Sequence, residues 1–178
     1  MPDNLKNAYV AIEDERFYKH NGVDIKRTGA AIFSYIFHFG SSSYGGSTIT
    51  QQLIKVATGD DSHSPTRKAR EIGSALYLTD HWSKAKILGS YINLVYYGNG
   101  AYGIYEASMT YFNTEPKNLN IAQAAILASI PNSPDNLNPY GSDSAKTRLI
   151  NRQKLVLKKM LELGLINENE YTDAINFN

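Results

Sequence analysis

The residues best suited to chemistry are concentrated in one stretch, residues 13–22, which reads EDERFYKHNG. This stretch directly follows an apolar run from Ala8 to Ile12. A carboxylate at the end of a packed helix loses water and becomes a better proton acceptor, which suits Glu13 to act as a general base. The alternative is a solvated helix end with ordinary surface charges, which is the commoner origin of such clusters. The remaining motifs have to decide between the two interpretations.

A helix predicted after Ser47 has a polar side and an apolar side. At helical spacing the polar side consists of Thr48, Gln51, Gln52 and Lys55, and the apolar side of Ile49, Leu53 and Val56. Adjacent amides and a lysine on one side of a helix are either solvated surface or a wall that binds sugars and phosphates. Both interpretations stay open on this helix alone.

The next predicted helix, which starts at Pro65, carries a cluster of cations. Arg67 and Glu71 are four residues apart, so they face the same way and can pair. Together with Lys68 and Arg70, Arg67 provides three cations within about one turn, which is enough to bind a pyrophosphate. An ordinary surface ion pair is the alternative.

Composition limits the class of protein. The chain has 178 residues, 42% of them hydrophobic, which fits a globular domain with a sizeable core. A formal net charge of +1 is not the signature of a nucleic-acid binder, and the absence of cysteine excludes disulfides and thiolate metal sites. No apolar run reaches the roughly 18 residues that span a bilayer. The charged stretch begins so close to Met1 that we expect the chain to be part of a longer, membrane-anchored protein.

The order of caps, apolar periods and breakers predicts a mainly α fold. Helices are expected at 104–112 and 121–130, and a long one from Ser142 to Leu163. No strand–turn–strand pattern is visible. An apolar stretch at 30–39 is too short to span a membrane, so it is either a core helix or an interfacial one.

Five motifs in order resemble a known family, the peptidoglycan glycosyltransferase domain (glycosyltransferase family 51). This domain occurs in class A penicillin-binding proteins and monofunctional transglycosylases. The motifs stand at 13–22, 46–55, 67–71, 86–103 and 127–134, and the resemblance covers nearly all of residues 1–178. Val56 stands where many members have asparagine, and Gly29-Ala30 where an arginine–alanine pair is common. Neither departure touches the expected catalytic residues.

The resemblance implies a lysozyme-like helical lobe with a smaller membrane-facing jaw lobe. The apolar stretch at 30–39 would lie in this jaw and insert into the outer leaflet. The implied location is the extracytoplasmic face of the bacterial membrane. The implied partners are lipid II, the growing lipid-linked glycan strand and other proteins of cell-wall synthesis, and no nucleic acid.

The resemblance also implies a reaction, the inverting polymerisation of lipid II with release of undecaprenyl pyrophosphate. Glu13 is the expected general base. The expected pyrophosphate ligands are Lys55, Arg67 and Lys68, helped by Arg152. Glu71, a second catalytic-site carboxylate, is expected to hold Arg67 or Lys68 in place, and contacts to sugars or the wall of the site are expected from Thr48, Gln51, Gln52 and Asn93. His20 and Asp14 are expected to be structural.

No cofactor is required in this scheme, and a divalent cation (Mg or Mn) is an expected optional helper at the pyrophosphate. The spacing Asp60-Asp61-x-His63 is only a weak metal motif, so no metal ligands are predicted.

Two other functions remain as alternatives. A lysozyme-like muramidase or lytic enzyme would use Glu13 as an acid on finished peptidoglycan, but it has no need of the cations. A non-catalytic binding module would not need Glu13 together with those cations.

Overall fold

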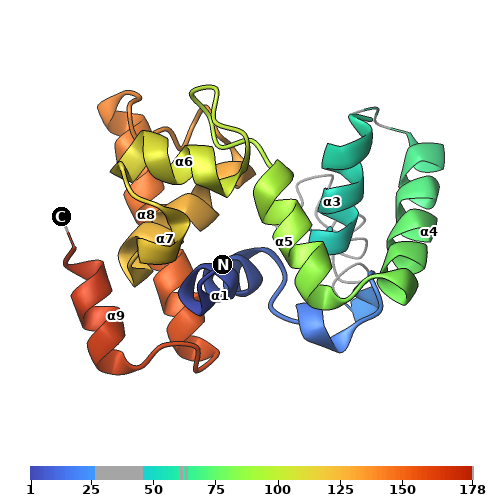
Figure 1. Cartoon of the computed structure of the whole chain (residues 1–178), viewed down its shortest axis with the longest axis horizontal. Helices are drawn as coiled ribbons and strands as arrows, with labels where there is room; N and C mark the ends of the chain where they lie inside the picture. The colour runs from blue at the N-terminus through green and yellow to red at the C-terminus, as the bar shows by residue number, and fades with distance from the viewer. Residues whose placement is uncertain (27–45, 61, 63, 178) are drawn as a thin grey trace, which may run out of the picture. The chain divides into compact units, whose positions relative to one another are not determined.

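The structure, a computed structural model, describes residues 1–26, 46–60, 62 and 64–177 (Figure 1). The predicted jaw segment at 30–39 lies outside the described residues, and so does most of the loop at 40–46. Described residues form helices joined by turns, and the β-structure among them is an isolated bridge between Tyr96 and Tyr102. The mainly α prediction is therefore confirmed.

The helices follow the order of the predicted caps and breakers. The α-helices are α1 (Asp3–Glu13), α3 (Ile49–Thr58), α4 (Pro65–His81), α5 (Lys84–Leu94), α6 (Gly103–Phe112), α7 (Ile121–Ser129), α8 (Asp143–Glu162) and α9 (Glu168–Ile175). Short 3₁₀ helices are η1 (Phe17–Lys19), η2 (Pro116–Asn118) and η3 (Ile130–Asn132). Several starts are capped as expected: the side chains of Thr48, Ser64, Ser142 and Asn167 each accept a backbone N–H of the helix that follows.

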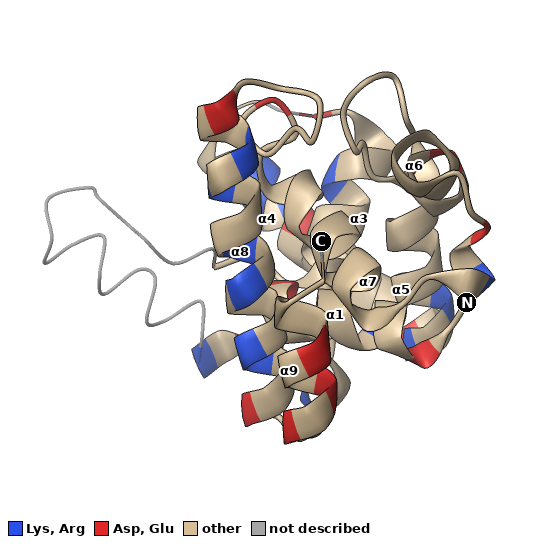
Figure 2. Cartoon of the chain, turned by 90° about the vertical axis from the view of Figure 1, so that its left-hand side faces the viewer, with Lys and Arg blue, Asp and Glu red and all other residues tan. Residues whose placement is uncertain are grey.

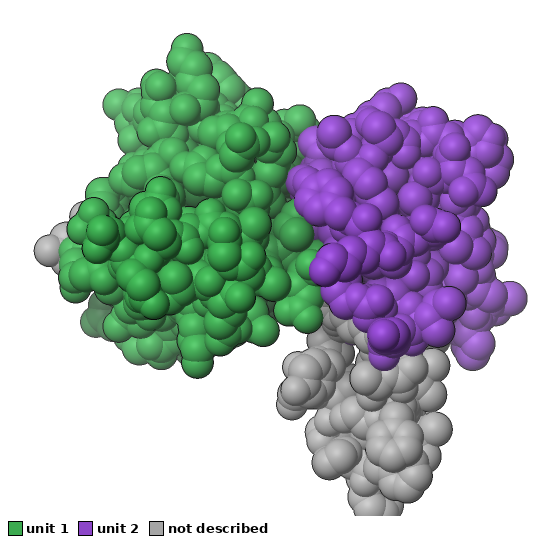
Figure 3. Space-filling model, turned by 90° about the horizontal axis from the view of Figure 1, so that it is seen from below, with its two compact units in different colours: residues 1–15, 92–178 green, residues 16–91 purple. Residues whose placement is uncertain are grey.

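The chain divides into two compact units, each with its own core (Figure 3). Unit 1 consists of residues 1–15 and 92–178, and unit 2 of residues 16–91. Glu13 therefore belongs to unit 1, whereas the cationic cluster on α4 belongs to unit 2.

Unit 1 is built around α7, which packs against α1 and α8. Most of α7 is buried, as its nearly continuous apolar sequence predicts. Beside it, the hydroxyl of buried Tyr9 donates to the hydroxyl of Tyr97, which donates to the carbonyl of Ile92 at 3.0 Å. Burial raises the pKa of Tyr97, so this chain of hydrogen bonds stays protonated. The bonds fix α1, whose last residue is Glu13.

The turn between α5 and α6 brings the two helices close together in unit 1. Gly103 has φ +79°, and a Cβ at this position would lie 2.5 Å from the carbonyl oxygen of Asn93. Only glycine fits both the backbone conformation and the space. Gly103 thus allows the end of α5 and the start of α6 to approach closely.

Unit 2 is organised around the packing of α3 on α4. Gly22 lies close against the backbone of α4. Its φ is +87°, and a Cβ at this position would lie 2.4 Å from the carbonyl oxygen of Ala75, so the position favours glycine. From the start of α3, the hydroxyl of Thr48 donates to the carbonyl of Gly22 at 2.6 Å. The glycine that ends the first motif thus positions both helices that carry the second and third motifs.

The predicted division of α3 into a polar and an apolar side is partly wrong. Ile49 and Leu53 are buried as expected, but Val56 is 39% exposed. The reason is that residues 55–59, at the end of α3, extend beyond its packing partners. Conversely, Thr48 and Gln51 of the predicted polar side are buried.

Candidate active site

Glu13 is the last residue of α1 and is only 8% exposed. The next peptide N–H, that of Asp14, closes the helix by donating to the carbonyl of Val10 at 3.1 Å. From α8, Nη2 of Arg152 lies 3.7 Å from Oε1 of Glu13. Basic side chains are distributed along α8 (Figure 2), and Arg152 pairs with this carboxylate. Unit 1 therefore contains a buried carboxylate beside a guanidinium.

The other charged residues of the first motif have separate partners. Glu15 is paired with Lys159 of α8 at 3.6 Å and is about half exposed. In unit 2, Lys84 donates to the carbonyl of His20 at 2.6 Å and lies over the Phe17 ring, 4.5 Å from its centre. The imidazole of His20 is buried against the same Phe17 ring. These contacts agree with the structural role predicted for His20, which stays a prediction.

Glu71 is the centre of the cationic cluster on α4 in unit 2. It is 6% exposed, and each of its carboxylate oxygens contacts a cation. Nη1 of Arg67 donates to Oε2 at 2.7 Å, and Nζ of Lys68 contacts Oε1. Lys68 also donates to the hydroxyl of Ser47 at 3.0 Å. The prediction that Glu71 holds Arg67 or Lys68 is confirmed, and it holds both.

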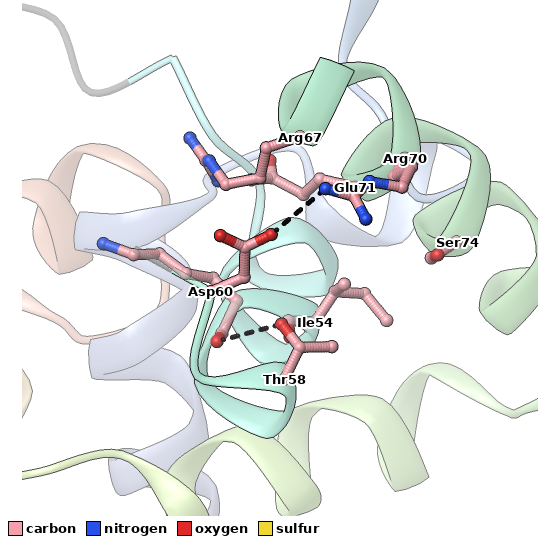
Figure 4. Close-up of a pocket in the computed structure, with 8 residues that line it drawn as sticks. Ile54, Thr58, Asp60, Arg67, Arg70, Glu71 and Ser74 are labelled. Atoms are coloured by element: carbon pink, nitrogen blue, oxygen red, sulfur yellow. Dashed lines mark hydrogen bonds and ion pairs between the residues drawn. The ribbon is translucent and has the colours of Figure 1, made fainter. Parts of the chain in front are cut away.

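Of these side chains, Arg67 and Glu71 border a cavity of about 320 Å³ between α3 and α4 (Figure 4). Its lining consists of Ile54, Lys55, Thr58, Asp60, Arg67, Arg70, Glu71 and Ser74. Three cations and two carboxylates therefore line it, which leaves an excess of positive charge. The structure brings together Lys55 and Arg67 as predicted from their motifs.

Asp60, which the sequence indicated only as part of a weak metal motif, is a candidate for a different role in the site. Its Oδ1 accepts hydrogen bonds from the backbone N–H and the hydroxyl of Ser62, at 3.1 and 2.6 Å. Its Oδ2 lies 3.4 Å from Arg70, and the carbonyl of Ser62 accepts from Nε of Arg67. The bonds from Ser62, with the nearby cations, lower the pKa of Asp60. Asp60 thus braces the segment that orients Arg67.

The residues predicted to contact sugars differ in their local roles. Thr48 and Gln51 form a capping box, in which Oγ1 of Thr48 accepts from N of Gln51 at 3.2 Å and Oε1 of Gln51 accepts from N of Thr48 at 3.0 Å. Gln52 is half-buried and accepts from the hydroxyl of Tyr91 at 2.9 Å. Asn93, near the end of α5, is exposed. The side chains of Thr48 and Gln51 are therefore buried in the cap of α3. Sugar contacts of all four residues stay predictions.

Among the described residues, no group of three or more histidine, aspartate or glutamate side chains is arranged to hold a metal ion. Residues 61 and 63 of the weak metal motif lie outside the described residues. In the same described part of the chain, none of the helices combines the length and the apolar character needed to cross a membrane.

The described residues define a class of protein: a mainly helical domain with a buried glutamate in unit 1 and a pocket lined by three cations and two carboxylates in unit 2. Comparison with known proteins makes the class specific. The transglycosylase family matches residues 1–161, so the chain belongs to this family. The predicted resemblance is thereby confirmed.

Two relatives illustrate the family. The chain is 45% identical over 180 residues to penicillin-binding protein 1A of Clostridium botulinum, an alignment that covers 98% of this chain and 22% of the relative. It is 39% identical over 183 residues to a monofunctional glycosyltransferase of Staphylococcus epidermidis, with 99% of this chain and 66% of the relative covered. The chain thus spans about a fifth of the length of the clostridial protein. Among solved structures, penicillin-binding protein 1A from Haemophilus influenzae matches 73% of this chain and 16% of that chain, with 22% identity and a TM-score of 0.47.

The family confirms the predicted reaction class, which is glycosyl transfer in peptidoglycan synthesis. The alternative of a muramidase is not favoured.

Proposed function

We propose that this domain polymerises lipid II into glycan strands, with Glu13 as the general base. Glu13 takes the proton of the 4-hydroxyl of the acceptor GlcNAc while that oxygen attacks C1 of the donor MurNAc. The bond from C1 to the pyrophosphate oxygen breaks, its electron pair leaves with undecaprenyl pyrophosphate, and the configuration at C1 inverts. General-base assistance of this kind contributes roughly 10²–10⁴-fold to the rate.

The observation that carries this proposal is the excess of cations around the cavity in unit 2. Arg67 and Lys68 are held by Glu71, so their positions are set before a substrate binds. Fixed cations that face a developing negative charge stabilise the transition state without reorganisation. Together with Lys55, these cations would neutralise the negative charge of a departing pyrophosphate. Hydrolysis of a bond between neutral sugars develops no such charge on the leaving group.

Glu71 has no proton-transfer role in this proposal. A pyrophosphate leaves as a stable anion and needs no acid, so a second carboxylate is free to serve the cations. Both oxygens of Glu71 already contact cations, which supports a positioning role.

Arg152 receives a different role from the one the sequence indicated. Its guanidinium lies beside Glu13 in unit 1, so we assign it to the orientation of the carboxylate and not to the pyrophosphate. Gln52 and Asn93 are better placed for sugar contacts than Thr48 and Gln51. Gln52 is half-buried and Asn93 is exposed, whereas the side chains of Thr48 and Gln51 bond to each other's backbone in the cap of α3.

The proposal requires no cofactor. A divalent cation such as Mg or Mn would be an optional helper bound through the pyrophosphate oxygens, because the described residues offer no cage for it. The proposed setting is the outer face of the bacterial membrane, where lipid II and the lipid-linked strand are presented, together with other proteins of cell-wall synthesis.

The test is incubation of labelled lipid II with the wild-type chain, with Glu13→Gln and with Glu15→Gln. Glu15 is the matched control, because it is two residues away and pairs with α8 but is about half exposed. We expect polymer from the wild type and from Glu15→Gln, and its loss in Glu13→Gln. Release of muropeptides from finished peptidoglycan, with no polymer made from lipid II, would overturn the proposal.

A further inference from the structure

A surface rich in tyrosine and poor in charge stands apart from the residues discussed so far. It lies in unit 1 and combines the turn between α5 and α6 with α6 itself and the segment before α8 (Figure 1). We call it the tyrosine platform, and its members are Tyr96, Asn99, Tyr102, Tyr111, Asn138 and Tyr140. No charged residue occurs at 93–105 or at 136–142.

Ring contacts and amide hydrogen bonds connect the platform. The rings of Tyr96 and Tyr102 lie 4.7 Å apart, and those of Tyr111 and Tyr140 lie 5.5 Å apart. Between the two pairs, Nδ2 of Asn99 donates to the hydroxyl of Tyr111 at 2.9 Å. The three segments therefore form one continuous surface.

The amide at the centre also reaches the third segment. Nδ2 of Asn99 donates to Oδ1 of Asn138 at 2.8 Å. Oδ1 of Asn138 also accepts a hydrogen bond from the backbone N–H of Tyr140 at 2.9 Å. This bond fixes the backbone position from which the Tyr140 ring projects. Polar amides thus alternate with aromatic rings across the surface.

The outer rings are exposed even though the structure fixes them. Tyr102 is 66% exposed and Tyr140 is 63% exposed. The hydroxyl of Tyr140 nevertheless donates to the carbonyl of Thr110 at 2.6 Å, and that of Tyr111 to the carbonyl of Tyr97 at 2.7 Å. Rigid aromatic side chains that stay exposed lose little conformational entropy when a ligand covers them.

The chemistry of the platform favours one class of ligand. Tyrosine faces pack on apolar C–H surfaces, and the neighbouring amides and hydroxyls bond to polar groups at the edge of the ligand. Segments 93–105 and 136–142 contain no lysine or arginine, and neighbouring Arg148 of α8 donates to the carbonyl of Asn136 at 3.1 Å. The platform therefore offers few cations to neutralise a phosphate or a nucleic-acid backbone. A neutral sugar ring offers both an apolar face and a polar edge.

We propose that the tyrosine platform binds the neutral N-acetylated sugar rings of a glycan strand. The inference rests on the proposed function, since it assigns a surface of unit 1 to the polymer on which the enzyme acts. It adds a binding surface made of side chains that have no part in proton transfer or in the cationic pocket.

The test is a titration of the wild-type chain with chitotetraose, a neutral oligosaccharide of N-acetylglucosamine, monitored by NMR. Tyr102→Leu and Tyr140→Leu remove an aromatic face and keep an apolar side chain. We expect each to bind about three- to tenfold more weakly than the wild type. Tyr102→Phe keeps the ring and should bind within about twofold of the wild type.

Tyr77→Leu is the matched control. Tyr77 of α4 in unit 2 is 65% exposed and stacks on His81 at 4.0 Å, so it resembles Tyr102 in exposure and in having a ring neighbour. Its replacement should leave chitotetraose binding unchanged. Thermal unfolding of every variant separates a lost contact from a lost fold.

The outcomes distinguish this inference from the proposed function. Absence of chitotetraose binding by the wild type, or equal binding by Tyr102→Leu, Tyr140→Leu and Tyr77→Leu, would overturn the platform even if lipid II is polymerised. Selective loss of binding in the two platform variants supports the platform even if no polymer forms from lipid II.

Discussion

Glu13 and Glu71 are buried to nearly the same degree, at 8% and 6% exposed, but their surroundings differ. Both oxygens of Glu71 contact cations from its own helix, at 2.7 Å in the case of Arg67. The ion pair of Glu13 is with Arg152 of another helix, and at 3.7 Å it is longer than a hydrogen bond. Burial alone therefore does not distinguish these two carboxylates, whereas the lengths of these ion pairs do.

The comparison has an energetic consequence. A buried carboxylate with two close cations stabilises the fold, because removal of its charge leaves those cations without a counter-charge. The longer pair between Glu13 and Arg152 contributes less to stability than the close pairs of Glu71, and it leaves the Glu13 carboxylate able to change its interactions during a reaction. Variants of the two glutamates should therefore separate activity from stability.

The largest effect is expected for Glu13→Gln. The amide keeps the shape but cannot take up the proton, so the rate of polymerisation should fall by about 10²–10⁴-fold. The free energy of unfolding should fall by less than in Glu71→Gln, because the pair with Arg152 is longer than the pair between Glu71 and Arg67. Polymerisation of labelled lipid II and chemical denaturation measure the two quantities. A Glu13→Gln variant that polymerises at the wild-type rate would remove the base from the mechanism.

Glu71→Gln should affect both quantities. Polymerisation should fall by about 10- to 100-fold, because Arg67 and Lys68 lose the group that positions them. The free energy of unfolding should fall by about 1–3 kcal/mol, because buried charge-assisted hydrogen bonds are lost. Denaturation and the same polymerisation assay provide the measurements. Wild-type stability in this variant would contradict the contrast between the two glutamates.

Arg152→Gln tests the assignment of Arg152 to Glu13. Without the guanidinium the carboxylate is less well oriented, so we expect kcat to fall by about tenfold with little change in KM. Arg152→Lys should restore part of the activity, because a charge is retained. A rise in KM for lipid II with kcat unchanged would instead support the pyrophosphate role that the sequence suggested.

Asp60→Asn should have the smallest effect. The asparagine retains part of the bonding to Ser62 but loses the charge beside Arg70, so KM for lipid II should rise by about two- to fivefold. Glu115→Gln, which removes an exposed pair with Lys117, is the control and should have no effect. Equal KM values in the two variants would show that Asp60 does not position Arg67.

The bracing by Asp60 also has a pH dependence. Because the pKa of Asp60 is lowered in the folded protein, its carboxylate stabilises the fold above the ordinary value of 3.8. That contribution is lost as the pH falls through the lowered value. At neutral pH the bracing should therefore be complete.

Local sequence spacing predicted those parts of the site that a single helix determines. Arg67 and Glu71 are four residues apart on α4, so helix geometry alone places them together, and the structure confirms the pair. The caps at Thr48, Ser64 and Ser142 could be predicted for the same reason. The error at Val56 arose because helical spacing does not reveal where the packing partners of a helix end.

The sequence by itself determined the helical class, the family and the local Glu71 cluster, because these depend on residue order and on spacings within one helix. Only the tertiary structure placed Arg152 beside Glu13, since the contact joins α1 and α8 across unit 1. It also assembled the tyrosine platform from three separate segments and connected Asp60 to Arg67 through Ser62. Contacts between distant segments depend on how helices pack, and no local spacing in the chain encodes them.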